Sequence, residues 1–261
     1  MTAHRMMTVL VIGFLTGLLI GMTGTGGGSL LTPLLLIFTP YSTLVIIGTD
    51  LVTGVITKLA GLLQHWRLGP IYWRLAAYVI IGSLPGSAAG VFFIHILRAH
   101  LGATRLDEIL KGFIGLALLA ASFSLPYVRR RKRLAPHSGA VMHISNLGCA
   151  EAGAMVGFLV ALTSVGSGSL MMVFLLLVTP VPIAELVGTD IMLGFATTIL
   201  AASLHLWRGH FDQQLFFALV AGSVPGVLLG SWFSHRIPDR YFGWALSALY
   251  FSLGTRLLLR L

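Results

Sequence analysis

Two aspartates, Asp50 and Asp190, stand inside long apolar stretches of this 261-residue chain. Ionisable side chains within a membrane are costly and by default mark a function or a buried pair. Because burial disfavours a charged carboxylate, the two aspartates could hold and release protons. The alternative is that both lie in the headgroup region and bond to the backbone. At helical spacing each aspartate shares a face with small or hydroxyl side chains, as in a helix that lines a narrow polar path. These side chains are Gly54, Thr57 and Gly61 after Asp50, and Gly194, Thr197 and Ala201 after Asp190.

Two further segments, residues 23–29 and 163–169, combine glycine with hydroxyl side chains. Each glycine destabilises a helix by about 1 kcal/mol, and the backbone groups that a break frees need partners inside a membrane. A helix that restarts after the break would direct its N-terminal amides at an anion. Glycine used only for tight packing is the alternative. The predicted substrate-binding residues are Thr25, Gly26, Gly27, Gly28, Ser29, Gly166, Ser167, Gly168 and Ser169, with Thr49 and Thr189 beside the aspartates.

Three more ionisable side chains are possible site residues. Lys58 lies two turns after Asp50, where it could supply positive charge to an anion or extend to the cytoplasmic interface. His65 and His205 end apolar stretches next to Trp-Arg pairs, which is typical of interfacial anchors, and a proton relay is the alternative. No cofactor and no metal site are predicted, and the single cysteine, Cys149, excludes a multi-cysteine metal site within one chain.

The composition places all of these residues in a membrane protein. Hydrophobic residues make up 56% of the chain and charged residues 10%, and the mean hydropathy is +0.92. A soluble domain carries about a quarter charged residues, so this chain lacks the polar surface that water requires. The net charge of +9 does not indicate nucleic acid, because the basic residues lie between apolar stretches. The expected partners are the lipid bilayer and a small anionic solute.

The chain carries its unusual residues twice. Residues 23–95 align without a gap on residues 163–235 at an offset of 140, with 24 identities in 73 positions. Shared apolar composition alone would not match aspartate, histidine and proline. Duplicated membrane halves are a common transporter design, with the binding site at the interface between the repeats.

The elements predicted in each half are helices, because the apolar stretches are long and do not alternate between apolar and polar residues. We predict an all-α integral membrane protein of two repeated four-helix halves, about eight spans, whose first helices are glycine-broken or re-entrant. Rows of glycine every fourth residue, such as Gly82, Gly86 and Gly90, predict close helix packing. The predicted units are 7–38, 41–63, 72–97 and 106–128 in the first repeat (1–128), then, after a basic linker (129–140), 147–178, 182–204, 213–234 and 241–259 in the second repeat (141–261).

The topology depends on whether the broken units cross the membrane. Five consecutive basic residues, 129–133, place the linker in the cytoplasm. If each broken unit crosses once, the halves are parallel, the loop at Arg208 is cytoplasmic and the loop near Arg98 is outside. If it is re-entrant, the halves are inverted and Arg5 lies outside. The arginines at both termini favour the parallel arrangement.

The order of these motifs also resembles a known family. A glycine-rich first unit, Gly48-Thr49-Asp50, a loop from His65 to Gly69 and the row from Gly82 to Gly90, all repeated, resemble the sulfite exporter TauE/SafE family of bacterial membrane transporters. The resemblance implies a four-plus-four helix protein of the cytoplasmic membrane that moves sulfite, sulfonates or related sulfur compounds, coupled to protons. Members of that family often have serine where this chain has Asp50 and Asp190, and a deprotonated carboxylate would repel an anion.

We therefore expect a proton-coupled secondary transporter for a small anion in the bacterial inner membrane, with Asp50 and Asp190 carrying protons. The alternative is a cation transporter or channel that uses the same two aspartates as ligands. An enzyme is not expected, because the chain has no H-E-x-x-H, G-x-S-x-G or paired-cysteine motif. The sequence leaves open the solute, the direction of transport and the oligomeric state.

Overall fold

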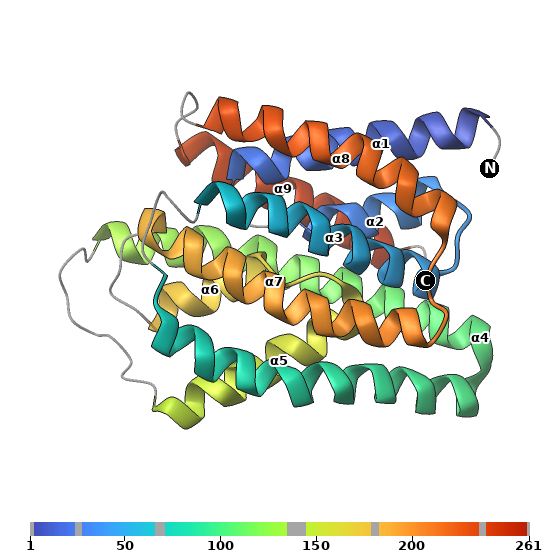
Figure 1. The fold of residues 1–261 in the computed structure, drawn as a ribbon, viewed down its shortest axis with the longest axis horizontal. Coiled ribbons are helices and arrows are strands. Elements are labelled where there is room, and N and C mark those ends of the chain that lie inside the picture. The colour runs from blue at the N-terminus through green and yellow to red at the C-terminus, as the bar shows by residue number, and fades with distance from the viewer. Residues whose placement is uncertain are drawn as a thin grey trace.

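The computed structural model describes residues 3–23, 28–65, 71–134, 145–178, 183–234 and 239–259, in which all regular structure is helical (Figure 1). Among these residues, six helices are long and apolar enough to cross a membrane, so the chain is a multi-pass membrane protein. The helices are α1 (Ala3–Thr23), α2 (Gly28–Phe38), α3 (Thr43–His65), α4 (Trp73–Leu134), α5 (Asn146–Thr163), α6 (Ser169–Val178), α7 (Ile183–Trp207), α8 (Gln213–Ser234) and α9 (Asp239–Leu258).

Both predicted first units are split in two. The second pieces, α2 and α6, begin at Gly28 and Ser169, which confirms the predicted restarts. In the second repeat α5 ends at Thr163. Its C-cap residue, Ser164, has a left-handed φ of 58°, and Gly166 follows with φ 113°. Residues with a side chain rarely adopt a positive φ, whereas glycine does so readily. The chain therefore reverses direction at a segment rich in glycine and serine. The equivalent residues 24–27 lie outside the described part of the chain.

Helix α4 joins the predicted third and fourth units of the first repeat. The two helical stretches meet at Gly102, whose φ of 76° and ψ of 175° form a sharp kink. After the kink the helix continues to Leu134. The basic run 129–133, predicted to begin a linker, therefore forms the last turns of a helix.

Each half packs its helices onto the other half. Helix α1 lies along α8, and α5 lies along the first part of α4. Glycines make both contacts close: a Cβ added at Gly82 would lie 1.8 Å from the Ala150 carbonyl oxygen, and one at Gly222 would lie 2.3 Å from that of Leu10. Gly82 and Gly222 are equivalent positions of the repeat. The prediction of close packing at the glycine rows is confirmed.

Several loops meet at one end of the molecule, here called the Arg208 end, defined by Arg5, Tyr41, Arg98, Arg208 and Asp212. Tyr41 interacts electrostatically with Arg5 and Asp212, and Arg98 and Arg208 line one cavity. Helix α3 begins at this end and α7 finishes there, so these equivalent helices run in opposite directions (Figure 1).

This arrangement corrects the expected topology. The loop at Arg208 and the turn after Arg98 were predicted on opposite faces, but both residues line the same cavity. The favoured parallel arrangement of the halves is also wrong. The physical reason lies in the broken units: α1 runs away from the Arg208 end and α2 runs back toward it (Figure 1). The unit therefore makes no net crossing of the membrane. Each half then has an odd number of net crossings, and the two halves are inverted relative to each other.

Candidate functional site

The polar faces predicted on the second helix of each repeat meet at the centre of the molecule. Helix α3 packs against α7. A Cβ added at Gly54 would touch the Thr198 methyl at 3.4 Å, and one at Gly194 would lie 2.3 Å from the Ser167 carbonyl oxygen. The glycines therefore allow the two helices and the break between α5 and α6 to approach closely. The result is a buried polar cluster between the repeats.

Lys58 is the cation of this cluster. Its side chain is 3% exposed, and Nζ donates hydrogen bonds to Ser167 Oγ at 2.5 Å and Thr198 Oγ1 at 2.6 Å. A longer contact of 3.4 Å reaches the Gly194 carbonyl oxygen. All three partners are neutral oxygens. Because the side chain turns into α7, the alternative in which Lys58 extends to the cytoplasmic interface is wrong.

Asp50 lies on the same helix, two turns before Lys58, and is 2% exposed. Its Oδ2 accepts a hydrogen bond from Ser164 Oγ at 2.9 Å and another from Thr32 Oγ1. Thr32 belongs to α2 and Ser164 to the break after α5. Asp50 therefore links α2, in the first repeat, to the broken segment of the second repeat.

Asp190, the duplicate of Asp50, is fully buried, and neither of its carboxylate oxygens has a hydrogen-bond partner among the residues that the structure describes. The sequence explains the difference. Thr32 aligns with Met172 and Ser164 aligns with Gly24, so both hydroxyl donors are missing from the second copy. Lys58 interacts electrostatically with both carboxylates. A buried carboxylate without donors is costly when it is ionised, which suits a group that binds a proton or faces a ligand.

Thr49 and Thr189, predicted to bind substrate, hold the backbone in matching ways. Thr49 Oγ1 accepts from the Asp212 amide at 3.1 Å, and Thr189 Oγ1 accepts from the Tyr72 amide at 3.1 Å. Asp212 and Tyr72 are also equivalent positions, each just before the third helix of a repeat. These hydroxyls therefore dock the start of one half's third helix onto the other half, and substrate binding by them stays a prediction.

The predicted glycine and serine residues are placed in part. Ser167 contacts Lys58, and Gly166 and Gly168 lie in the same buried break. Gly28 begins α2 and Ser169 begins α6. Ser29 lies in the first turn of α2. Three residues, Thr25, Gly26 and Gly27, fall outside the described residues. Binding of a substrate by this group remains a prediction.

His205 is not an interfacial anchor. Its ring is fully buried, with Nε2 2.9 Å from the Ala161 carbonyl oxygen and Nδ1 3.1 Å from Nδ1 of His210. The neighbouring Trp207 is 78% exposed and does fit an interfacial position. His65 is the last residue of α3, and its side chain is outside the described part of the structure.

Sequence reasoning did not select Thr32, Ser164 and Thr198 as site residues. A hydroxyl within an apolar helix is a weak signal, because it can bond to the preceding turn of its own helix. Only the fold shows that these three hydroxyls face Asp50 and Lys58 instead. Arg98 and Arg208 were used only to assign the topology of loops, and His210 was not singled out. The structure brings the three side chains together in a cavity.

The comparisons with known proteins agree with this membrane fold. The family model described as Sulfite exporter TauE/SafE matches residues 9–257. The chain belongs to this family. YjnA of Bacillus subtilis (strain 168), called a probable membrane transporter protein, is 34% identical over 255 residues, covering 96% of this chain and 99% of that relative. The family and this similarity identify the chain as a membrane transporter rather than an enzyme.

More distant relatives carry the same description. YunE of Bacillus subtilis (strain 168) is 24% identical over 264 residues, 96% of each chain. A probable membrane transporter protein of Xylella fastidiosa (strain 9a5c) is 25% identical over 260 residues, covering 93% of this chain and 92% of that protein. No solved structure gives a significant match.

Proposed function

We propose that this member of the TauE/SafE family is a secondary transporter for a small anion, such as sulfite, a sulfonate or a related sulfur compound, in the bacterial cytoplasmic membrane. The observation that carries the proposal is the environment of Lys58. Among the described residues, the buried ammonium of Lys58 has only neutral oxygens at hydrogen-bond distance. When Asp50 and Asp190 are protonated, its positive charge is left for an anion to compensate. The break between α5 and α6 places the Ser167 hydroxyl beside this cation, at the interface between the repeats.

The topology that supports this function is an inverted pair of four-unit halves. In this arrangement the two pieces of each broken unit run in opposite directions, so the unit makes no net crossing of the membrane. The basic run 129–133 orients the end of α4 toward the cytoplasm. The Arg208 end then faces outward.

Cation transport, the alternative, would use Asp50 and Asp190 as ionised ligands. Lys58 interacts electrostatically with both carboxylates and would repel a cation between them. Among the described residues, no three histidine, cysteine or acidic side chains gather into a metal-binding group. Transport of an anion is therefore the better fit to this cluster.

The proton coupling rests on Asp50 and Asp190. A protonated aspartate next to the anion removes charge repulsion. Release of the proton and the anion on the same side, followed by return of the empty, deprotonated site, couples the two fluxes. We expect Asp50→Asn and Asp190→Asn to abolish the response of flux to a pH gradient, because asparagine cannot take up a proton. Flux of sulfite, thiosulfate, sulfoacetate and taurine into proteoliposomes, with and without the gradient, measures this response.

The matched control is Glu151→Gln, since Glu151 is an exposed acid on α5. This variant should respond to the gradient as the wild type does. If both aspartate variants kept the full response, the proton-carrying role would be rejected. If no anion but a monovalent or divalent cation moved, the cation alternative would replace the proposal.

A further inference from the structure

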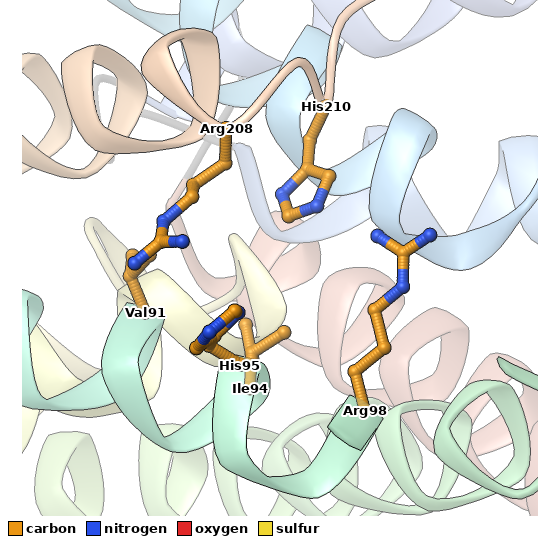
Figure 2. Close-up of a pocket in the computed structure, with 6 residues that line it drawn as sticks. All are labelled: Val91, Ile94, His95, Arg98, Arg208 and His210. Atoms are coloured by element: carbon orange, nitrogen blue, oxygen red, sulfur yellow. The ribbon is translucent and has the colours of Figure 1, made fainter. Parts of the chain in front are cut away.

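A cavity of about 260 Å³ lies at the Arg208 end, away from the Lys58 cluster. The last turns of α4 before its kink form one wall, and the loop between α7 and α8 forms the other. Figure 2 shows Arg98 and His95 reaching up from α4 while Arg208 and His210 reach down from the loop. Val91 and Ile94 complete the lining. At roughly 30 Å³ per water molecule the cavity has room for a small oxyanion with its hydration.

The polar side chains of the cavity are all bases. Among the described residues the structure has one salt bridge, between Lys111 and Asp107, so neither Arg98 nor Arg208 has a carboxylate partner there. The Arg208 guanidinium does lie 5.0 Å from the centre of the Trp207 ring. Planar guanidinium groups with free donors are suited to bidentate recognition of oxyanions. Two of them on opposite walls make the cavity selective for negative charge.

His210 lies between the two guanidinium groups in the view of Figure 2 and is mostly buried, with 9% of its surface exposed. Burial and the charges of Arg98 and Arg208 lower the pKa of His210 to about 4. The other titratable groups that face it are His95 in the cavity and His205 behind it. Asp212 follows two residues later in the loop, and the uncharged Gly48 of α3 packs against the His210 backbone.

The hydrogen bonds behind His210 determine where a further proton would bind. The Ala161 carbonyl can only accept, so Nε2 of His205 donates to it. Nδ1 of the neutral His205 ring therefore accepts from Nδ1 of His210. Nε2 of His210 remains as the position for an additional proton.

We propose that this cavity is a docking site for small sulfur oxyanions at the outer face, where Arg98 and Arg208 bind the anion before it reaches the Lys58 cluster. The inference rests on the proposed function for its ligand and direction, and it adds a site that is separate from the central one. A bound anion offsets the field of the two guanidinium groups at His210. Anion binding therefore takes up a proton at this ring.

The test compares Arg98→Gln and Arg208→Gln with Arg105→Gln, whose parent residue is an exposed arginine on α4 beyond the kink and outside the cavity. Sulfite flux is measured in right-side-out and inverted membrane vesicles, and binding of radiolabelled thiosulfate is measured on each purified variant. Loss of a charge-assisted hydrogen bond should raise the half-saturating sulfite concentration about tenfold in both cavity variants. This change should occur when sulfite is supplied to the outer face, and Arg105→Gln should behave as the wild type.

The pH dependence of binding gives a second readout. Thiosulfate keeps its double charge between pH 8 and pH 5, so the protein alone supplies any change. Because the empty site holds the pKa of His210 at about 4 and a bound anion raises it, thiosulfate affinity should rise as the pH falls across this range. His210→Gln should remove this dependence while leaving binding itself in place.

The outcomes separate the docking site from the transport assignment. The docking site is overturned if the cavity variants match Arg105→Gln, if the change appears equally from both faces, or if wild-type thiosulfate binding is absent or independent of pH. If the wild type moves no sulfur anion, the proposed function fails, and the cavity is judged by binding alone. Thiosulfate binding that is lost in Arg98→Gln and kept in Arg105→Gln would then still support it.

Discussion

Replacing Lys58 by methionine is expected to lower anion flux about 100-fold, because truncating one partner of a buried charge contact costs about 3 kcal/mol. Methionine matches the length and volume of the lysine stem but carries no charge. Among the described residues, Lys58 Nζ hydrogen-bonds to neutral oxygens, so a bound anion would be its counter-charge while Asp50 and Asp190 are protonated. Flux into proteoliposomes under saturating and limiting anion measures the loss.

Folding and transport can be separated in this variant. Thermal unfolding checks that Lys58→Met still folds, because removing the lysine leaves Asp50 and Asp190 buried without their cation. The matched control is Lys111→Met, because Lys111 is paired with Asp107 and is about one-third exposed. Wild-type flux in Lys58→Met would reject the central anion site, whereas an increased cation flux would favour the cation alternative.

The duplication offers a stricter form of the same test. Position 198 is the repeat equivalent of position 58, and Thr198 already bonds to the lysine. The double variant Lys58→Thr with Thr198→Lys moves the charge to the other repeat. We expect it to recover part of the flux that Lys58→Thr loses. No recovery would indicate that the charge must lie on the Asp50 helix.

A second large effect is expected on the stability of the fold. Gly82→Ala and Gly222→Ala should each lower the free energy of unfolding by about 2 to 3 kcal/mol, since overpacking a well-fitted contact costs about this much. The new methyl groups would lie 1.8 Å and 2.3 Å from carbonyl oxygens of Ala150 and Leu10, which are fixed in neighbouring helices. Denaturant titration in mixed micelles, followed by circular dichroism or by a fluorescent label, measures the change.

The control for this prediction is the same substitution at Gly54. Its new methyl group would touch Thr198 at 3.4 Å, an ordinary contact. Alanine is also the better helix former by about 1 kcal/mol, so Gly54→Ala should be neutral or slightly stabilising. Equal effects at Gly82, Gly222 and Gly54 would show that the repeats are not held together by close approach at the glycine rows.

Local properties of the sequence predicted the helices well. The third helix of the second repeat, 213–234, matches α8 (Gln213–Ser234), and the breaks in both first units occur where glycine is dense. Hydropathy and backbone propensity act within a few residues, so they can be read directly from the chain. The site was predicted only in part. Asp50 and Lys58 stood out by charge, while hydroxyl partners such as Thr32 did not.

By itself the sequence determined the class of protein and its duplicated plan, because apolar composition and an offset of 140 are properties of the linear chain. Tertiary structure alone decided the opposite directions of α3 and α7, the partners of Lys58 and the meeting of Arg98 with Arg208. The Lys58–Ser167 contact joins residues 109 positions apart. Such contacts depend on whether a glycine break reverses the chain, and this is settled by packing between the halves rather than by any local pattern.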